Sequence, residues 1–387
     1  MLLLFALLVL AVLVAFLGIV LVNLWVLPTV TRFGNSTSRE RKVALLVPAR
    51  NEAANIEACL RSLLQQDYAG LEVWLYDDAS TDGTAEIATR IGEEDRPAGV
   101  NLHIVSGTVG PPSGWLGKAN ACHRLYAAMM AESDPDYVLF TDADVRFAPS
   151  AVSQAVAAAD SLGAGLLSIF PRQVTISWAE RLAVPILLHW AVYNFLPLPL
   201  AFSKRTGPAF AAANGQFMLF KREAYEACGG HAAVRSEILE DVALARAVKR
   251  AGYRAMLADG GPLVHTRMYN GPGEVWQGYS KNAYAFFGYS PVFLAIGIVV
   301  LLVLYVLPLL LAAFFLPTVV GFVFLAQYVT AVLTRLALAV RFRYPLLDML
   351  LHPVAIVYMI AIEVNSMVWA LTGRGNWKGR GVRSEGQ

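Results

Sequence analysis

The sequence is poor in charged residues. Asp, Glu, Lys and Arg make up only 16% of its 387 residues, whereas 57% are hydrophobic. Residues 1–31 and residues 290–334 contain no charged side chain. This composition, with a mean hydropathy of +0.51, argues against two soluble domains and favours one domain accompanied by membrane segments.

Cysteine is also scarce. The three cysteines, Cys59, Cys122 and Cys228, show no CxxC spacing. Metal-binding and redox roles are therefore less favoured than the packing of free thiols in a core.

The uncharged stretches predict where the chain meets a membrane. Residues 1–27 are predicted to span, because Leu2–Val22 reaches the length of about 20 residues that a span needs. A cleaved signal peptide fits less well, since no basic residue precedes this run and no small-x-small site follows it. Residues 291–371 are predicted to hold two spans and, at 346–371, a third span or a re-entrant segment.

The distribution of basic residues predicts the orientation. Several follow the first span closely, at 32–42, and none precedes it. The positive-inside rule then predicts a multi-pass protein of the cell membrane with residues 32–290 in the cytoplasm. An interfacial connection is expected at 271–290 and a basic tail at 372–387.

Residues 42–270 are predicted to form an α/β domain. Short apolar strands at 43–47, 73–76, 102–105 and 137–140 alternate with stretches of helical periodicity. This alternation predicts a parallel sheet with helices on both faces, in which ligands bind beyond the carboxyl ends of the strands.

One uncharged stretch inside this domain, 182–202, is interrupted by prolines. If it crossed the membrane, Asp144 and Asp241 would lie on opposite sides. We therefore expect an interfacial segment, with Trp190 and Tyr193 at the level of the lipid headgroups. A buried core helix fits the stretch equally well.

Polar clusters follow three of the predicted strands: "PARNE" at 48–52, "DDASTDGT" at 77–84 and "TDADV" at 141–145. Each alone could be a surface turn or a helix cap. Together on one sheet edge they predict a site. Asp142 and Asp144, in an extended segment, would point the same way and suit Mg²⁺ or Mn²⁺ when phosphate oxygens and water complete the shell.

Two further motifs carry charge. Lys118, in "GWLGKAN", could meet a diphosphate, or it could be an ordinary surface lysine. Glu240 and Asp241 begin a predicted helix, where the helix dipole alone would explain them. The functional alternative is that Asp241 is a general base.

These motifs, in this order, resemble the inverting GT-A glycosyltransferases of family 2. The matching stretches are "LLVPARNEAANIEACLRSLLQQDY", "LYDDASTDGT", "GWLGKANA", "FTDADVRF", "NGQFMLFKREAYEACGGH" and "EDVALARAVKRAGYR". "GWLGKANA" and "WQGYSKN" most resemble the membrane-bound branch, which includes ceramide glucosyltransferases and hopene-associated and carotenoid-glucosylating enzymes. The resemblance implies a Rossmann-like GT-A nucleotide-sugar domain flanked by transmembrane helices.

The resemblance also implies roles for single residues. Asp241, of the Glu240–Asp241 pair, would be the catalytic base. Asp144 would be the direct metal ligand and Asp142 its helper, also near the donor. The nucleotide sugar would be bound by Pro48, Glu52, Asp77, Asp78 and Lys118. The donor sugar or the acceptor would meet Gln216, Trp276, Gln277 and Lys281.

The predicted function is metal-dependent transfer of one sugar from a nucleotide sugar, by resemblance a UDP-sugar, to a hydroxyl of a lipid-like acceptor with inversion. No nucleic-acid partner is expected. A processive polysaccharide synthase is an alternative, but "VWQGYSKNAY" lacks the Arg-Trp pair that such synthases of the family carry. A non-catalytic membrane scaffold is a second alternative, against which the intact Asp142, Asp144 and Asp241 argue.

Overall fold

The computed structural model describes residues 1–35, 41–94, 100–373, 376–377 and 380–381. They divide into two compact units. The sheet unit comprises residues 27–174 and 200–268, and the helical unit comprises residues 1–26, 175–199 and 269–381.

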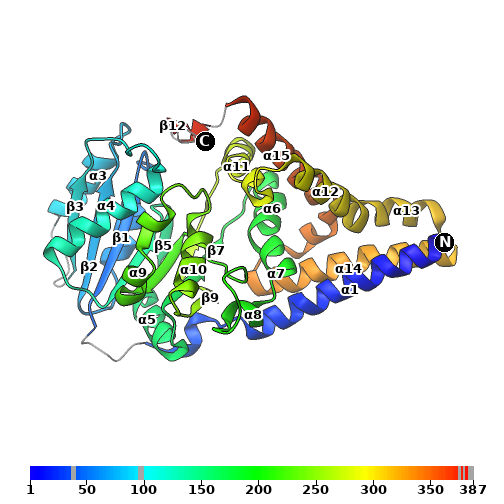
Figure 1. Ribbon diagram of the computed structural model, residues 1–387, viewed down its shortest axis with the longest axis horizontal. Helices are drawn as coiled ribbons and strands as arrows, with labels where there is room; N and C mark the ends of the chain where they lie inside the picture. Colours follow the sequence, from blue (N-terminus) through cyan, green and yellow to red (C-terminus); the bar gives the residue numbers. More distant parts are fainter. Residues whose placement is uncertain (36–40, 95–99, 374–375, 378–379, 382–387) are drawn as a thin grey trace. The chain divides into compact units, whose positions relative to one another are not determined.

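The sheet unit is built on a mixed seven-stranded sheet in the order β3-β2-β1-β4-β8-β6-β9 (Figure 1). Its strands are β1 (Val43–Ala49), β2 (Leu71–Asp77), β3 (Asn101–Ser106), β4 (Tyr137–Thr141), β6 (Leu166–Phe170), β8 (Phe217–Lys221) and β9 (Ala255–Asp259). Strands β1 to β4 are parallel, as predicted. The prediction of an all-parallel sheet is wrong, because β8 runs antiparallel to both β4 and β6.

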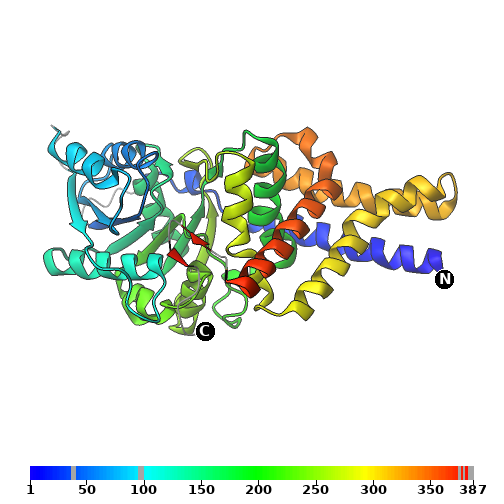
Figure 2. The ribbon, with the colours of Figure 1, turned by 90° about the horizontal axis from the view of Figure 1, so that it is seen from above.

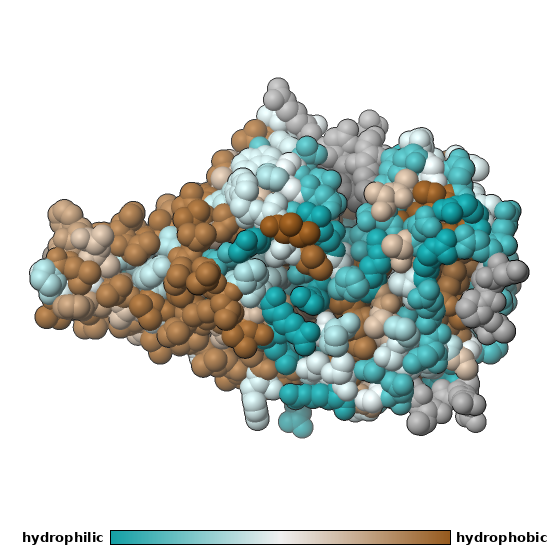
Figure 3. Space-filling view, turned by 180° about the vertical axis from the view of Figure 1, so that it is seen from behind, coloured by the Kyte–Doolittle hydropathy of each residue, from teal (hydrophilic) through white to brown (hydrophobic). Residues whose placement is uncertain are grey.

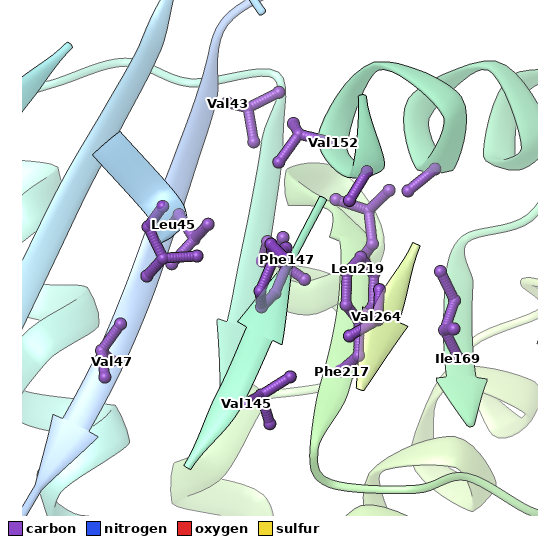
Figure 4. Close-up of a cluster of buried hydrophobic side chains, with 14 of the residues drawn as sticks. Val43, Leu45, Val47, Val145, Phe147, Val152, Ile169, Phe217, Leu219 and Val264 are labelled. Carbon is purple, nitrogen blue, oxygen red and sulfur yellow. The ribbon is translucent and has the colours of Figure 1, made fainter. Parts of the chain in front are cut away.

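Helices cover both faces of this sheet, which confirms that part of the prediction. They are α2 (Ile56–Leu64), α3 (Thr84–Glu93), α4 (Gly117–Glu132), α5 (Ala151–Leu162), α9 (Arg222–Ala227) and α10 (Glu240–Arg250). Alternate residues of β1 enter different cores: Val43, Leu45 and Val47 pack toward α2 and α5 (Figure 4), whereas Ala44 and Leu46 pack toward α4 and α10. A strand buried on both faces has a continuous apolar sequence, as this one does.

A small second sheet of order β5-β10-β7 lies in the same unit. Its strands are β5 (Val145–Phe147), β7 (Arg172–Gln173) and β10 (Val264–Thr266). β10 pairs antiparallel with β5 and parallel with β7, so Thr266 lies opposite both Val145 and Gln173. Short helical turns η1 (Val30–Phe33) and η3 (Gly230–Val234) complete the unit.

The helical unit contains four helices long and apolar enough to cross a membrane: Leu2–Val26, Pro291–Phe315, Val319–Phe342 and Leu346–Thr372. Figure 3 shows apolar side chains gathered over this part of the chain. In this unit, Leu4, Phe293 and Phe314 are at least 64% exposed. Exposed apolar side chains on long apolar helices indicate membrane association. The final helix is continuous from Leu346 to Thr372, and whether it spans or re-enters stays a prediction.

The elements of the helical unit are α1 (Leu2–Val26), α6 (Trp178–Val184), η2 (Pro185–Trp190), α7 (Ala191–Phe195), α11 (Pro272–Ser280), η4 (Ala283–Phe287), α12 (Pro291–Leu301), η5 (Leu302–Val306), α13 (Leu307–Phe315), α14 (Val319–Phe342), η6 (Leu346–Leu351), α15 (His352–Thr372), β11 (Asn376–Trp377) and β12 (Arg380–Gly381). Helix α1 packs along α14, as Figure 1 and Figure 2 show. Helix α8 (Leu198–Phe202) lies where the chain passes between the two units.

The uncharged stretch 182–202 is helical for most of its length, through α6, η2, α7 and α8. Trp190 and Tyr193 are 1% and 0% exposed, so the prediction that these rings lie among lipid headgroups is wrong. The Trp190 ring packs edge-on against Tyr305 and His352 of the same unit. For these two side chains the alternative of a buried helix is the one that the structure supports.

Candidate functional site

The polar clusters predicted from the sequence lie at one edge of the large sheet. Strands β2, β1 and β4 are adjacent and parallel, with Ala49 opposite Asp77 and Leu46 opposite Phe140. Their carboxyl ends therefore meet, and the loops that follow them lie side by side, as parallel strands require.

The loops after β1 and β2 are joined by hydrogen bonds. The Asn51 and Glu52 backbone N–H groups donate to Ser80 Oγ and Thr84 Oγ1 at 3.0 and 2.8 Å. Asp82 Oδ1 accepts from the Thr84 N–H at 3.1 Å. The "DDASTDGT" turn thus both starts helix α3 and holds the loop after β1.

Two carboxyls follow β2 in a more enclosed position. Asp77 and Asp78 are 5% and 3% exposed. Both Asp77 oxygens lie 3.3 Å from the Ser80 N–H, which donates to them. Pro48, near the end of β1, and Glu52, in the loop that follows it, are half-buried. These four residues predicted to bind the nucleotide sugar therefore lie at the carboxyl ends of two neighbouring strands and in the loops that follow.

The segment from Asp142 to Asp144 is not extended, and that prediction is wrong. It forms a turn between β4 and β5, closed by a hydrogen bond from the Val145 N–H to the Asp142 carbonyl at 3.3 Å. Arg146 Nη1 donates to the Val145 carbonyl at 3.2 Å and so braces the turn. The turn gives the two carboxylates different partners.

Asp144 is held by the small sheet. Thr266 Oγ1 donates to Asp144 Oδ2 at 3.1 Å and lies 3.0 Å from the Asp144 carbonyl. Asp144 Oδ1 is buried and has no hydrogen-bond partner among the described residues. Burial, together with repulsion from Asp142 and Glu52, raises the pKa of Asp144 to about 7.

Lys118 forms the centre of an ion-pair cluster. From the first turn of α4, its Nζ lies 2.7 Å from Asp142 Oδ1 and 3.0 Å from Glu240 Oε1. Burial alone would lower the pKa of Lys118, but the Asp142 and Glu240 carboxylates outweigh it and raise this pKa well above its usual range. The structure therefore excludes the alternative of an isolated surface lysine.

Asp241 lies beside this cluster in the first turn of α10. Its Oδ2 accepts from the Gly215 N–H at 3.0 Å, and its Oδ1 accepts from the Val242 N–H at 2.8 Å. Burial and repulsion from Glu240 raise the pKa of Asp241 to about 7, while Lys118 and the two N–H donors act in the opposite direction. A carboxyl poised near neutral pH can act as a general base.

Gly215 allows the cluster to close. A Cβ at this position would meet Lys118 Nζ at 3.2 Å, and Asp241 Cβ and Glu240 Oε1 at 3.6 Å. Next to it is a small open recess lined by Pro48, Lys118, Cys122, Phe140, Thr141, Asp142, Gly215, Met218, His231 and Glu240. The recess thus brings together residues from most of the motifs that the sequence singled out.

Residues 44–229 match the model of glycosyl transferase family 2. Over these residues, just under half of its length, the chain is similar to this family. One relative is the 4,4'-diaponeurosporenoate glycosyltransferase of Staphylococcus aureus strain USA300, which is 28% identical over 248 residues. The match covers 62% of this chain and 60% of the relative, so it spans less than two thirds of the relative's length.

One solved structure has a similar fold over nearly the whole chain. The mannosyltransferase PcManGT from Pyrobaculum calidifontis, in complex with GDP-Man and Mn²⁺, superposes with a TM-score of 0.52 at 20% sequence identity. The superposition covers 96% of this chain and 99% of that one. The predicted fold class, a GT-A domain with long apolar helices at both ends, is thereby confirmed, with a mixed rather than a parallel sheet.

Gln216 of this glycosyl transferase domain lies in a buried amide network. Gln173 Nε2 donates to Gln216 Oε1 at 2.9 Å, and Asn214 Oδ1 accepts from the Gln216 N–H at 2.8 Å. Thr141 Oγ1 donates to the Gln216 carbonyl at 2.7 Å. Neither Gln173 nor Thr266 was predicted as a site residue, because each lies in a strand of only two or three residues.

Trp276, Gln277 and Lys281 belong to the helical unit. They lie on α11 and at its C-cap, where Gln277 is exposed and the Trp276 ring lies 6.1 Å from the Tyr358 ring. Their predicted contact with the donor sugar or the acceptor stays a prediction. The cysteines are buried free thiols, as predicted, and burial raises the pKa of Cys59 to about 12.

Proposed function

We propose that this protein transfers a single sugar from a nucleotide sugar to a carotenoid-like lipid acceptor, with inversion and with the help of a divalent metal. The observation that carries the proposal is the cluster of Lys118, Asp142, Glu240 and Asp241 beside Asp144 at the carboxyl edge of the sheet. The diaponeurosporenoate relative supports the acceptor class. The motif resemblance favours a UDP-sugar, although GDP-Man accompanies the Pyrobaculum enzyme.

The residues present fit a divalent cation. The buried Asp144 Oδ1, which has no hydrogen-bond partner within the described chain, is a free hard-oxygen ligand. Asp142 could add a second, through the oxygen that Lys118 does not bind. No group of three or more His, Cys, Asp or Glu side chains suited to a metal occurs among the described residues. The diphosphate and water must therefore complete the shell, and Mn²⁺ accompanies the donor in the Pyrobaculum enzyme.

The chain's own residues have separate roles in this reaction. Asp241 accepts the proton of the acceptor hydroxyl as that oxygen attacks the anomeric carbon of the donor sugar. The bond from this carbon to the diphosphate oxygen breaks, and its electron pair leaves with the diphosphate. Lys118 stabilises the charge that grows on this leaving group, and a bound metal would act as a Lewis acid on the same charge. One displacement inverts the anomeric centre.

Membrane association supports the choice of a lipid acceptor. The helices of the helical unit are long and apolar enough to span. We place the sheet unit in the cytoplasm because basic residues follow the first helix and none precedes it. A nucleotide sugar would reach it from the cytosol, and the lipid from the bilayer.

Replacing Asp241 by Asn tests the proposal. The purified full chain is incubated with UDP- and GDP-sugars, Mn²⁺ and a carotenoid alcohol or acid, and products are identified by mass. We expect one hexose per acceptor, and a loss in turnover of about 100-fold or more in Asp241→Asn with donor affinity nearly unchanged. Glu237→Gln, an exposed change just before α10, is the control. Unchanged turnover in Asp241→Asn would remove it as the base, and long sugar chains would favour a polymerase.

A further inference from the structure

The buried face of helix α14 carries polar side chains inside the helical unit. Gln327, Thr330, Thr334 and Arg335 are all at most 8% exposed. Gln327 Nε2 donates to the Ala6 carbonyl of α1 at 2.6 Å. Thr330 and Thr334 donate to carbonyls of their own helix, four residues back, at 2.8 and 2.9 Å. These donors are satisfied within the bundle.

Arg335 differs from its neighbours on this face. It is 1% exposed, and both its terminal nitrogens, Nη1 and Nη2, lack a hydrogen-bond partner in the part of the chain that the structure describes. Arginine keeps its proton in proteins, so this side chain is a positive charge. A charge inside a membrane bundle is costly unless an anion compensates it.

An acidic side chain in this region, Asp348, is already paired. Asp348 is close enough to act electrostatically on Arg335. However, Arg181 binds both Asp348 oxygens, each at 2.6 Å. The Tyr344 hydroxyl, which is also close, pairs with His189 Nδ1 at 2.8 Å. Neither group forms a salt bridge or hydrogen bond with Arg335.

Two more buried donors extend this region. His352, 0% exposed and close enough to feel the charge of Arg335, has no partner for either ring nitrogen among the described residues. Its ring packs edge-on against Trp190, at 5.5 Å between centroids. The Trp190 Nε1–H is buried and likewise has no acceptor within the described chain. A guanidinium and two rings with buried, unpartnered nitrogens therefore lie in one part of the helical unit.

We propose that Arg335, with His352 and Trp190, binds the oxyanion of an amphiphilic lipid, a carboxylate or a phosphate, within the helical unit. The guanidinium fork matches the two oxygens of such a group, and the ring donors can share the remaining lone pairs. The apolar helices around it suit the acyl or polyene tail. This site needs neither nucleotide sugar nor metal, so it can be tested independently of the transfer activity.

Binding of defined amphiphiles to the full chain in neutral detergent tests the site. The probes are phosphatidylglycerol against phosphatidylcholine, and oleate against oleyl alcohol, with retained lipid counted by native mass spectrometry and the Tm followed. We expect the anionic probes to bind the wild type and raise its Tm. Arg335→Met should bind them about tenfold or more weakly. Arg343→Gln, an exposed change beyond the end of α14, should bind as the wild type does.

The pattern across probes separates the sources. Binding of phosphatidylglycerol alone assigns the site to a bilayer phosphate, binding of oleate alone to an acidic lipid, and binding of both to either oxyanion. Without an anionic probe, Arg335→Met should be at least as stable as the wild type, because an uncompensated charge has been removed. If Arg335→Met does not fold, Arg335→Lys serves instead, keeping the charge but losing the fork, with an affinity several-fold lower. Equal affinity of wild type and folded variant would overturn the inference.

Discussion

At the scale of single residues, one cation organises the charge of the site. Lys118 lies between the Asp142 and Glu240 carboxylates, and its charge also lowers the pKa of Asp241. Three acidic side chains can therefore lie close together, because the positive charge of Lys118 offsets part of their mutual repulsion.

This arrangement predicts the pH dependence of the reaction. Below about pH 7, Asp241 takes up a proton, since its pKa is raised to about 7, and it can no longer accept one from the acceptor. We expect kcat/KM to fall as pH falls through about 7. In Lys118→Met, kcat/KM should begin to fall at a higher pH, and donor binding should be weaker. Lys204→Met, an exposed change, should leave the pH dependence and the donor affinity unchanged. If kcat/KM fell at the same pH in Lys118→Met as in the wild type, this would contradict the electrostatic role of Lys118.

A second prediction at this scale concerns Thr266. Its hydroxyl donates to Asp144, the proposed direct metal ligand. Thr266→Val keeps the shape and removes the donor, so the Mn²⁺ concentration for half-maximal activity should rise about 10-fold or more. Mn²⁺ titration measures this, and chelation should abolish activity in both proteins. Thr89→Val, an exposed change on α3, is the control. Identical Mn²⁺ titrations would show that Thr266 does not tune the ligand.

At the scale of elements, helix α10 does more than present Asp241. Lys249, two turns along it, donates through Nζ to the Ala201 carbonyl, Thr206 Oγ1 and the Phe210 carbonyl, at 2.9 to 3.1 Å. The bonded segment leads directly to Gly215, whose N–H binds Asp241. One helix therefore holds both the carboxylate and the loop that orients it.

Lys249→Met should loosen that loop. The loss of hydrogen bonds to two buried or half-buried carbonyls should cost about 1–3 kcal/mol of stability and lower turnover. Thermal unfolding and kcat are measured together, with exposed Lys204→Met as the matched control. If stability fell by the expected amount while kcat stayed unchanged, the loop would not be what positions Asp241.

At the scale of the whole molecule, long-range hydrogen bonds order the helical unit. Asn23 of α1 is 0% exposed; its Nδ2 donates to the Tyr193 and Leu196 carbonyls at 2.7 and 2.8 Å, and its Oδ1 accepts from the Leu198 N–H at 2.7 Å. The first helix is thus bound to a segment some 170 residues away. In an apolar setting these backbone groups have no water to bind instead.

Asn23→Leu should therefore destabilise the full chain by about 1–3 kcal/mol, seen as a lower Tm in detergent. The control is Trp25→Leu, because Trp25 lies on the same helix and is 84% exposed. Equal Tm values for the two variants would mean that Asn23 only fills space.

Much of the architecture follows from local patterns. Apolar runs of strand length predicted β1 to β4 within two residues at each end, and helical spacing predicted α2 and α4. Uncharged runs predicted the first three long helices, whereas the fourth, at 346–371, was expected either as a span or as a re-entrant segment. The antiparallel direction of β8 had no such signal, because the residue types of a short, mostly apolar strand do not indicate its direction.

The sequence alone identified the residues of the candidate site, since Lys118, Asp142, Asp144, Glu240 and Asp241 were all singled out from their motifs. Only the tertiary structure decided how they are connected. It turned the two aspartates of the Asp142–Asp144 turn to different partners, bound Asp144 to Thr266 at a separation of 122 residues, and buried Trp190 and Arg335 inside the helical unit. Periodicity and residue type indicate the local structure of a short segment. Burial and hydrogen-bond partners depend instead on segments that only folding brings together.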